Sequence, residues 1–470
     1  MHNGRYSSFF VSLANNTACD QKRAVLFTHY SNRGLLPTLG RRTLPKLCLA
    51  QSPLSKQGAQ MDKPFSYYVS LDGPHLDGLI GHAGMLRFDW PAKTTSMEYY
   101  DGVSGGHNVS IAPSGKIGLL GNFSQQLVLV DMENLKELTR QSTMRIEHAN
   151  YRLRSNTHHL WYDDNQHFIG AVGDHLYRFD INDLSSPVKL GPHLLYNAHE
   201  LRWDRSKRFI LMGDLGPEDA APRQVGVFDL ETNESTVIKL PDTCWHVCVH
   251  PEKPLGYAAT YSFATEDEDY VDWSPAFRRE YVFEIDLPQK RVRRSWSGGA
   301  EFPIHLNSDI GVYDDKLYLS CGGSHTVVEL NLADGEFREP RVLDGLPDLW
   351  KRARMWRQKI YNIIGASARR PTLINTHYIL QTLLVTGWRN MDGIYSARVS
   401  PDGKYLVTGS RGYNVLTVYE RESFKKIYST QLPTFGPEVY RRPYSKFLKR
   451  INGMHLGMHH SEMRPEPPEN

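Results

Sequence analysis

The chain repeats one pattern of short strands and turns, and this repetition limits the possible folds more than any other feature. In each unit the residue pattern predicts four strands joined by turns. The second strand ends in Gly, and the third is apolar and mostly ends in Asp. The units are about 40–50 residues long, which is the period of a β-propeller blade. One such sheet cannot bury both of its faces, so the units must stack around an axis and close.

Six clear blades begin near residues 107, 158, 199, 246, 305 and 395, and residues 65–104 predict a degenerate seventh. Ser-Pro-Asp-Gly-Lys at 400–404 resembles the first-to-second strand turn of the YVTN and WD40-like seven-bladed propellers. The resemblance covers most of residues 65–430. It implies a fold but no function, because such propellers include scaffolds, hydrolases and oxidoreductases. We therefore expect an all-β, seven-bladed β-propeller over residues 61–437, with one helical insertion at 346–375 and N- and C-terminal extensions.

The two ends of the chain fall outside this pattern. Residues 1–60 carry eight Lys or Arg and a single acid, Asp20, which is typical of an organelle transit peptide. The alternative is an over-extended start, with Met61 as the true initiator. The protein is then intracellular in either case: organelle-targeted with a transit peptide, or cytoplasmic with a start at Met61. The tail at 438–470 is expected to pack on the rim of the propeller and then to fray.

Composition excludes several classes of protein. Residues 61–470 contain 47 basic and 51 acidic residues, so bulk charge does not indicate nucleic-acid binding. Five cysteines make no disulfide framework and fit a reducing compartment. No apolar run approaches the roughly 18 residues of a transmembrane segment. We find no Gly-rich phosphate loop and no Gly-x-Gly-x-x-Gly, so we predict no nucleotide or dinucleotide cofactor.

Three histidines recur in one register. His158, His199 and His246 each stand five residues before an Asp or Pro that opens a turn. In propellers of this kind the first strand of each blade lines the axis and begins at one mouth, so these side chains are expected to converge there. Two further histidines stand near this register: His107, one residue before Asn108, and His305, about three residues away from it.

These five histidines form our candidate metal set: His107, His158, His199, His246 and His305. Neutral imidazole nitrogen suits copper or iron, with zinc as a weaker candidate. Glu200 and Glu301 stand beside this set and are candidates for orienting its imidazoles. The arrangement is similar to that of carotenoid cleavage oxygenases and nitrous oxide reductase, which hold metals with histidines from several blades. The surrounding motifs of neither family are present. The alternative is that the histidines bridge strands or bind substrate.

Two other groups of potential ligands are weaker candidates. Cys244, His246, Cys248 and His250 alternate on one predicted strand and span about 20 Å, too far for one tetrahedral ion. A pair formed by His246 with either cysteine remains an alternative, although such cysteines are more often small buried apolar groups. His455, His459 and His460 lie in the tail, and we do not expect ligands from a segment with this composition.

Three insertions depart from the repeat, at residues 214–223, 261–278 and 346–375. Residues 214–223 and 261–278 lengthen turns of adjacent blades and are acidic, which suits a solvated rim, a cationic substrate or a protein partner. Their candidate contact residues are Asp214, Glu266, Asp267, Glu268 and Asp269. Apolar residues recur at helical spacing through 349–363, so we expect an amphipathic helix there. It would lie over the mouth as a lid, through Trp350, Arg354 and Trp356, or pack on the side of the propeller.

Two functions follow from these expectations. The first is a copper- or iron-dependent oxidoreductase or oxygenase that acts on a small substrate at the axial histidines. The second is a non-catalytic β-propeller scaffold for protein–protein interaction. The two differ in one structural requirement, because the enzyme needs imidazoles that converge on one point and the scaffold does not.

Overall fold

The computed structural model describes the propeller and leaves the two terminal extensions and the longest insertion outside the described residues. The described residues are 63–72, 83–103, 105–122, 124, 126–143, 146, 157–173, 175–191, 195, 198–214, 223–241, 243–260, 281–297, 307–321, 326–338, 394–410, 415–432 and 457–464. Contacts divide the chain into Met1–Asp62 and Lys63–Asn470, and every described residue belongs to the second unit. The predicted leader at 1–60 and the helical insertion at 346–375 therefore lie outside the described residues.

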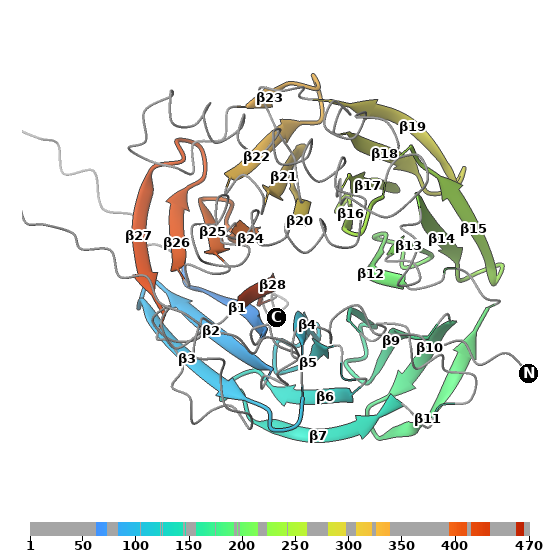
Figure 1. The fold of residues 1–470 in the computed structure, drawn as a ribbon, viewed down its shortest axis with the longest axis horizontal. Helices are drawn as coiled ribbons and strands as arrows, with labels where there is room; N and C mark the ends of the chain where they lie inside the picture. Colours follow the sequence, from blue (N-terminus) through green and yellow to red (C-terminus); the bar gives the residue numbers. More distant parts are fainter. Residues whose placement is uncertain are drawn as a thin grey trace, which may run out of the picture. The chain divides into compact units, whose positions relative to one another are not determined.

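Seven four-stranded antiparallel sheets make up the described part of the chain (Figure 1). From the axis outwards, the first sheet contains β28 (Gly457–Met463), β1 (Phe65–Asp72), β2 (Gly84–Trp90) and β3 (Thr94–Tyr99). The second contains β4 (Gly106–Ile111), β5 (Ile117–Asn122), β6 (Gln126–Asp131) and β7 (Glu137–Ser142). The third contains β8 (His159–Trp161), β9 (His167–Val172), β10 (His175–Asp180) and β11 (Asp183–Leu190).

The remaining four sheets follow the same order. The fourth contains β12 (Ala198–Trp203), β13 (Phe209–Asp214), β14 (Gln224–Asp229) and β15 (Glu234–Lys239). The fifth contains β16 (Val247–Val249), β17 (Leu255–Ala259), β18 (Val282–Asp286) and β19 (Arg291–Trp296). The sixth contains β20 (Asn307–Tyr313), β21 (Lys316–Cys321), β22 (Thr326–Asn331) and β23 (Phe337–Arg338). The seventh contains β24 (Ile394–Val399), β25 (Tyr405–Ser410), β26 (Val415–Glu420) and β27 (Lys426–Gln431).

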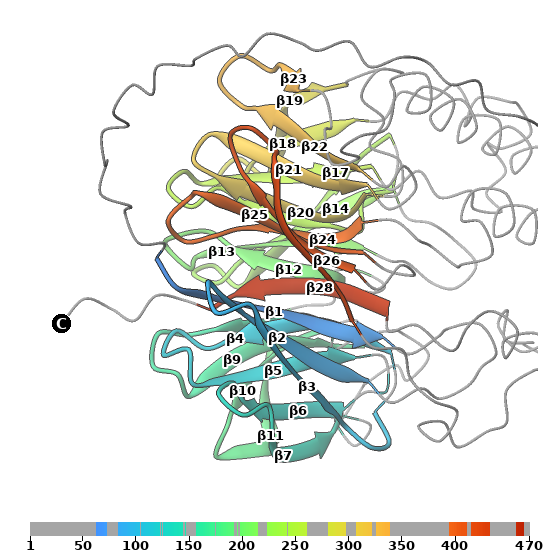
Figure 2. The same cartoon turned by 90° about the vertical axis from the view of Figure 1, so that its left-hand side faces the viewer.

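The innermost strands contact their neighbours in a closed circle, which confirms the predicted seven-bladed β-propeller. No α-helix occurs within the described ranges. The first blade differs from our expectation. Residues 65–104 supply only its three outer strands, and the fourth is β28 from the C-terminal tail, which lies beside β1 (Figure 2). The expectation that the tail packs on the rim is therefore wrong for 457–463.

The hydrophobic core is divided among the seven interfaces between neighbouring sheets. One cluster, for example, joins Val227 of β14 to Ile285 of β18, and another joins Val69 of β1 to Val418 of β26. Second strands such as β13 and β25 are buried along their whole length, whereas outermost strands such as β3 and β7 are largely exposed. This gradient follows from the architecture, because a middle strand is covered on both faces and an outermost strand reaches solvent.

Glycines set the spacing between blades near the axis. An added Cβ at Gly121 would lie 1.8 Å from the carbonyl oxygen of Thr157, and one at Gly213 would lie 1.9 Å from that of Trp245. Both contacts are with backbone of the next blade, which cannot move aside cheaply. The glycine at the end of the second predicted strand, which the sequence repeats, thus allows each blade to approach the next directly beside the start of its innermost strand.

Candidate metal centre

The innermost strands place side chains at matching positions around the axis. In five blades the same backbone hydrogen bond closes the turn after the innermost strand. The donors are the amides of Ala112, Tyr162, Asp204, His250 and Ser400, each bonded to the carbonyl five residues later. The residue four positions before each donor is therefore equivalent in these blades. In the sixth blade Asp309 follows a bulge just as Asn108 does, and in the first blade His460 lies in the bulge of β28.

We call these seven equivalent residues the second ring, and the residues immediately before them the first ring. The second ring consists of Asn108, His158, Glu200, His246, Asp309, Ser396 and His460. The first ring consists of His107, Thr157, His199, Trp245, Ser308, Tyr395 and His459. Each ring contains three histidines, contributed by different blades.

The predicted register of His199 is wrong by one residue. Asp204 does not match Asp163. Its carboxylate accepts the amide of Phe209 at 2.8 Å, as the hydroxyl of Ser400 accepts the amide of Tyr405 at 2.9 Å. Asp204 is therefore the residue that caps the turn, one position earlier than we expected. Glu200 takes the second-ring place, and His199 lies in the first ring.

All six ring histidines form one buried cluster, and none is more than 7% exposed. His107 is central to it: its ring centroid lies 4.2 Å from that of His459, 4.4 Å from His199 and 4.6 Å from His460. His246 lies 4.6 Å from His460, and His158 lies 5.2 Å from it. The structure thus brings together four of the five histidines of the candidate set: His107, His158, His199 and His246.

Three of these imidazoles are close enough to share one ion. Ligand nitrogens of His107, His199 and His460 all lie within 4.8 Å of one another. The Nε2 atoms of His107 and His199 are only 3.0 Å apart. Two nitrogens that share a metal at about 2.0–2.1 Å also lie about 3 Å apart, so this spacing fits a common ligand position.

Burial keeps three of the ring imidazoles neutral. Burial, with the neighbouring histidines adding to it, lowers the pKa of His107, His158 and His460 well below the usual value. Neutral imidazole is the form that binds metals. At His158 the structure also indicates which ring nitrogen can bind a metal. Its Nδ1 lies 2.7 Å from the carbonyl oxygen of His199, which can only accept, so Nδ1 carries the proton and Nε2 the lone pair.

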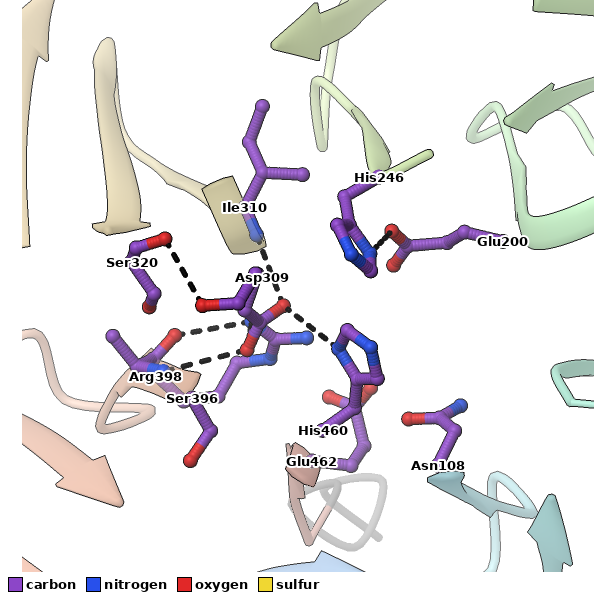
Figure 3. A network of polar contacts seen from close by, with 12 residues as sticks. Asn108, Glu200, His246, Asp309, Ile310, Ser320, Ser396, Arg398, His460 and Glu462 are labelled. Atoms are coloured by element: carbon purple, nitrogen blue, oxygen red, sulfur yellow. Dashed lines mark hydrogen bonds and ion pairs between the residues drawn. The ribbon is translucent and has the colours of Figure 1, made fainter. Parts of the chain in front are cut away.

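Two buried carboxylates of the second ring lie against the histidines (Figure 3). Glu200 Oε2 lies 3.3 Å from Nδ1 of His246, and Glu200 Oε1 lies 3.8 Å from Nε2 of His158. Asp309 Oδ1 lies 3.7 Å from Nδ1 of His460. Both carboxylates are fully buried, so each would cost a large desolvation energy without a cationic partner.

Arginines of the innermost strands supply these partners. Each stands two residues after a second-ring place: Arg202 follows Glu200 in the same blade, and Arg398 follows Ser396 in the blade next to that of Asp309. Arg202 Nη2 lies 2.7 Å from Glu200 Oε1, and Arg398 Nη1 lies 2.7 Å from Asp309 Oδ2. Burial by itself lowers the pKa of Arg398, but the carboxylates around it outweigh burial and raise it. Glu462 of β28 lies 3.9 Å from Arg202. The two arginines and three carboxylates together carry one net negative charge beneath the histidines.

The other predicted site residues have different outcomes. His305, Glu301, the acidic residues 266–269 and the lid residues Trp350, Arg354 and Trp356 lie outside the described residues. Asp214 is not on an exposed rim: it is fully buried and accepts a hydrogen bond from Gln224 Nε2 at 2.7 Å. Cys244 and Cys248 are buried, and burial raises the pKa of Cys248 well above its usual value. His250 caps a turn and contacts Asp315 at 3.2 Å, away from the cluster.

Sequence reasoning missed two histidines of the cluster, His459 and His460. Both lie on β28, which the local pattern did not predict as a strand. One signal was available, because residues 65–104 supply three strands where a blade needs four. A propeller needs a fourth strand to complete its first blade. The tail segment with the adjacent histidine pair could have been considered as that missing strand.

The fold and the cluster together define a seven-bladed β-propeller with an axial histidine centre. No protein-family model and no curated protein matches the sequence. Among solved structures, the chain is similar to dihydro-heme d1 dehydrogenase NirN in complex with DHE, at 12% identity and a TM-score of 0.46 over 74% of this chain and 61% of that chain. It is also similar to the hydrazine synthase of Kuenenia stuttgartiensis, at 14% identity and a TM-score of 0.47 over 72% of this chain and 92% of that chain. At such identities a likeness extends to the fold and not to the activity. No helix in the described ranges is long and apolar enough to cross a membrane.

Proposed function

We propose that the chain is a metal-dependent oxidoreductase or oxygenase that holds copper or iron at the axial histidines and acts on a small substrate. One observation carries the proposal: nitrogens of His107, His199 and His460 lie within 4.8 Å of one another, inside a buried cluster of six imidazoles. A hydrogen bond between His107 and His199 accounts for one pair of these nitrogens, but it does not account for the third imidazole, His460, whose ring nitrogens have no hydrogen-bond partner among the described residues.

The donor set favours copper or iron. It consists of neutral imidazole nitrogens, which suit these metals, whereas calcium and magnesium require oxygen ligands. The nearest carboxylates, Glu200 and Asp309, each bond an arginine and contact imidazoles from the side. In that position Glu200 orients His246, and both carboxylates offset the charge of a bound cation. A three-imidazole set also leaves coordination positions open, which catalysis on a small molecule requires.

The residues of this chain divide the work between them. His107, His199 and His460 would hold the ion, which supplies Lewis-acid or redox chemistry when bound. His158 donates its Nδ1 proton in a hydrogen bond to the carbonyl of His199. Its lone pair is therefore on Nε2, which is directed away from that carbonyl. Glu200 holds His246, and Asp309 faces His460.

Elemental analysis of the untagged full-length chain tests the proposal. The protein is purified without added metal, then supplied separately with Cu(I), Cu(II), Fe(II) and Zn(II), and the bound metal is counted by plasma mass spectrometry. We expect about one copper or iron per chain. His199→Ala and His107→Ala should each reduce this content to near zero, because they remove members of the close nitrogen triad, while the circular dichroism spectrum of the propeller is retained.

His167→Ala provides the matched control. His167 is a partly exposed histidine that bonds Asp164 at 2.6 Å and lies outside the cluster. This variant should bind as much metal as the wild type. A wild-type protein that folds but binds none of the four ions would contradict the proposal. It would favour the scaffold function, which a search for partner proteins would then address.

A further inference from the structure

The C-terminal strand connects the histidine centre to the closure of the ring. β28 lies innermost in the first sheet and has one hydrogen-bonded neighbour, β1. It also contacts β24 and β4, the innermost strands of the two flanking blades. Without β28 the seventh and second blades would have no innermost strand between them, so its seating decides whether the circle of innermost strands is closed.

The same strand supplies a third of the ring histidines. His459 lies in the first ring and His460 in the second, at the bulge where the pairing of β28 with β1 is interrupted. The pairing of β28 with β1 is therefore interrupted at His459 and His460, the two residues that face the cluster. The other four histidines come from β4, from β12 and from the starts of the third and fifth blades.

The buried side chain of His460 would be stabilised by a ligand on the axis, and such a ligand would also hold β28 in place. This side chain is fully buried, and neither ring nitrogen has a hydrogen-bond partner among the described residues. Asp309 is nearest, at 3.7 Å from Nδ1, which is beyond hydrogen-bond length. Burying a polar side chain without a partner opposes folding. The seated strand is thus penalised at His460 unless another ligand, such as a metal ion, occupies the nitrogen.

Met458 holds the other side of the strand by packing alone. It is fully buried in the cluster between the first and seventh blades, and its sulfur lies 3.2 Å from the position that a Cβ on Gly409 would take. β28 is therefore fixed by apolar packing at one residue and carries an unsatisfied ligand nitrogen at another. These two features act on the same equilibrium between a seated and a released strand.

We infer that metal binding at the histidine centre and seating of β28 are one coupled equilibrium, so that the ion latches the C-terminal strand and closes the propeller. This inference rests on the proposed metal function. It assigns the ion a structural and regulatory role in addition to chemistry. An ion that binds only the seated form stabilises that form, and a change that releases β28 weakens the apparent binding of the ion in proportion to the fraction of chains that stay seated.

Hydrogen exchange of the full-length protein measures the latch directly. Amide exchange of 457–463 is compared by mass spectrometry with and without the ion that elemental analysis identifies. At a free ion concentration of about 100 times its Kd, we expect about 100-fold slower exchange in β28. Exchange in β14, which contributes no ring residue, should change much less. Equal exchange of β28 in the two states, at one ion per chain, would overturn the latch and leave the metal function intact.

Met458→Ala tests the reciprocal effect without touching a ligand. It should loosen β28 and speed its exchange, and it should lower metal affinity in proportion to the fraction of chains in which the strand stays seated, because the ion binds only that fraction. Met132→Ala is the control, because Met132 is equally buried but packs between the first and second blades without being part of β28. Faster β28 exchange in Met458→Ala that saturating ion no longer slows, at one ion per chain, would contradict the coupling. If no ion binds the wild type, the proposed function and the latch are both wrong.

Discussion

Glu200 and Asp309 occupy second-ring places in blades that carry no second-ring histidine. Each accepts backbone amide hydrogens: Val247 donates to Glu200 at 2.9 Å, and Ile310 donates to Asp309 at 2.9 Å. Each also pairs with an arginine and lies beside an imidazole. Both carboxylates are therefore held in place beside the histidines. The second ring combines imidazoles with buried carboxylates whose charge can offset that of a bound cation.

Glu200→Gln should weaken metal binding roughly 10-fold, because it removes a buried negative charge that offsets the charge of the bound cation. Glutamine keeps the size of the side chain but loses the charge that His246 and Arg202 face. The measurement is a competition titration of the ion against a chelator. Glu284→Gln is the matched control, since Glu284 is equally buried and bonds Arg294 at 2.9 Å but lies outside both rings. A similar loss of affinity in both variants would show a general effect of destabilisation.

The residue scale also shows how far the sequence could define the site. The repeated turns place His158 and His246 correctly, because each turn follows its innermost strand at a fixed distance. The same rule fails by one residue at His199. An aspartate can open a turn or cap it from the preceding position, and Asp204 does the second. Sequence spacing cannot separate the two cases, since the choice depends on which amides the carboxylate reaches.

At the scale of elements, the blades were predictable and the closing strand was not. Apolar residues mark the second and third strands of most blades because both faces of those strands are buried. β28 reads Gly-Met-His-His-Ser-Glu-Met, and only Met458 and Met463 are apolar in it. Its residues His460 and Glu462 face the axis instead of a core. Its pairing partner, β1, lies at the other end of the propeller sequence, so no local pattern connects them.

Deleting residues 457–470 should leave six complete blades and a three-stranded first sheet. We expect a loss of stability greater than the about 2–5 kcal/mol that truncation of one buried Met costs, because the deletion also removes the β1 ladder partner. Chemical denaturation monitored by tryptophan fluorescence measures this loss. A peptide of residues 457–470 added in trans should restore part of it by adding a strand to β1. Full stability without β28 would show that the ring does not need it.

On the scale of the whole molecule, the hydrophobic packing of the described residues is distributed over seven separate interfaces, and these residues form no central hydrophobic core. Each interface uses side chains from two neighbouring sheets, and the axis is lined with polar residues. Such a molecule tolerates long insertions between strands, provided that the sheets still meet. The longest gap between described strands, 339–393, separates β23 from β24 and contains the predicted helix at 346–375.

Deleting residues 346–370 should therefore keep the propeller and its metal content while changing access to the centre. Enough chain remains between β23 and β24 to join the sixth blade to the seventh, so we expect a melting temperature within a few degrees of the wild type. Metal content by plasma mass spectrometry should also match the wild type, because the ring histidines are unchanged. If the segment is a lid, exchange of the bound ion with a chelator should become faster. An insoluble product would instead show that the segment packs on the side of the propeller, and unchanged exchange kinetics in a soluble product would contradict the lid.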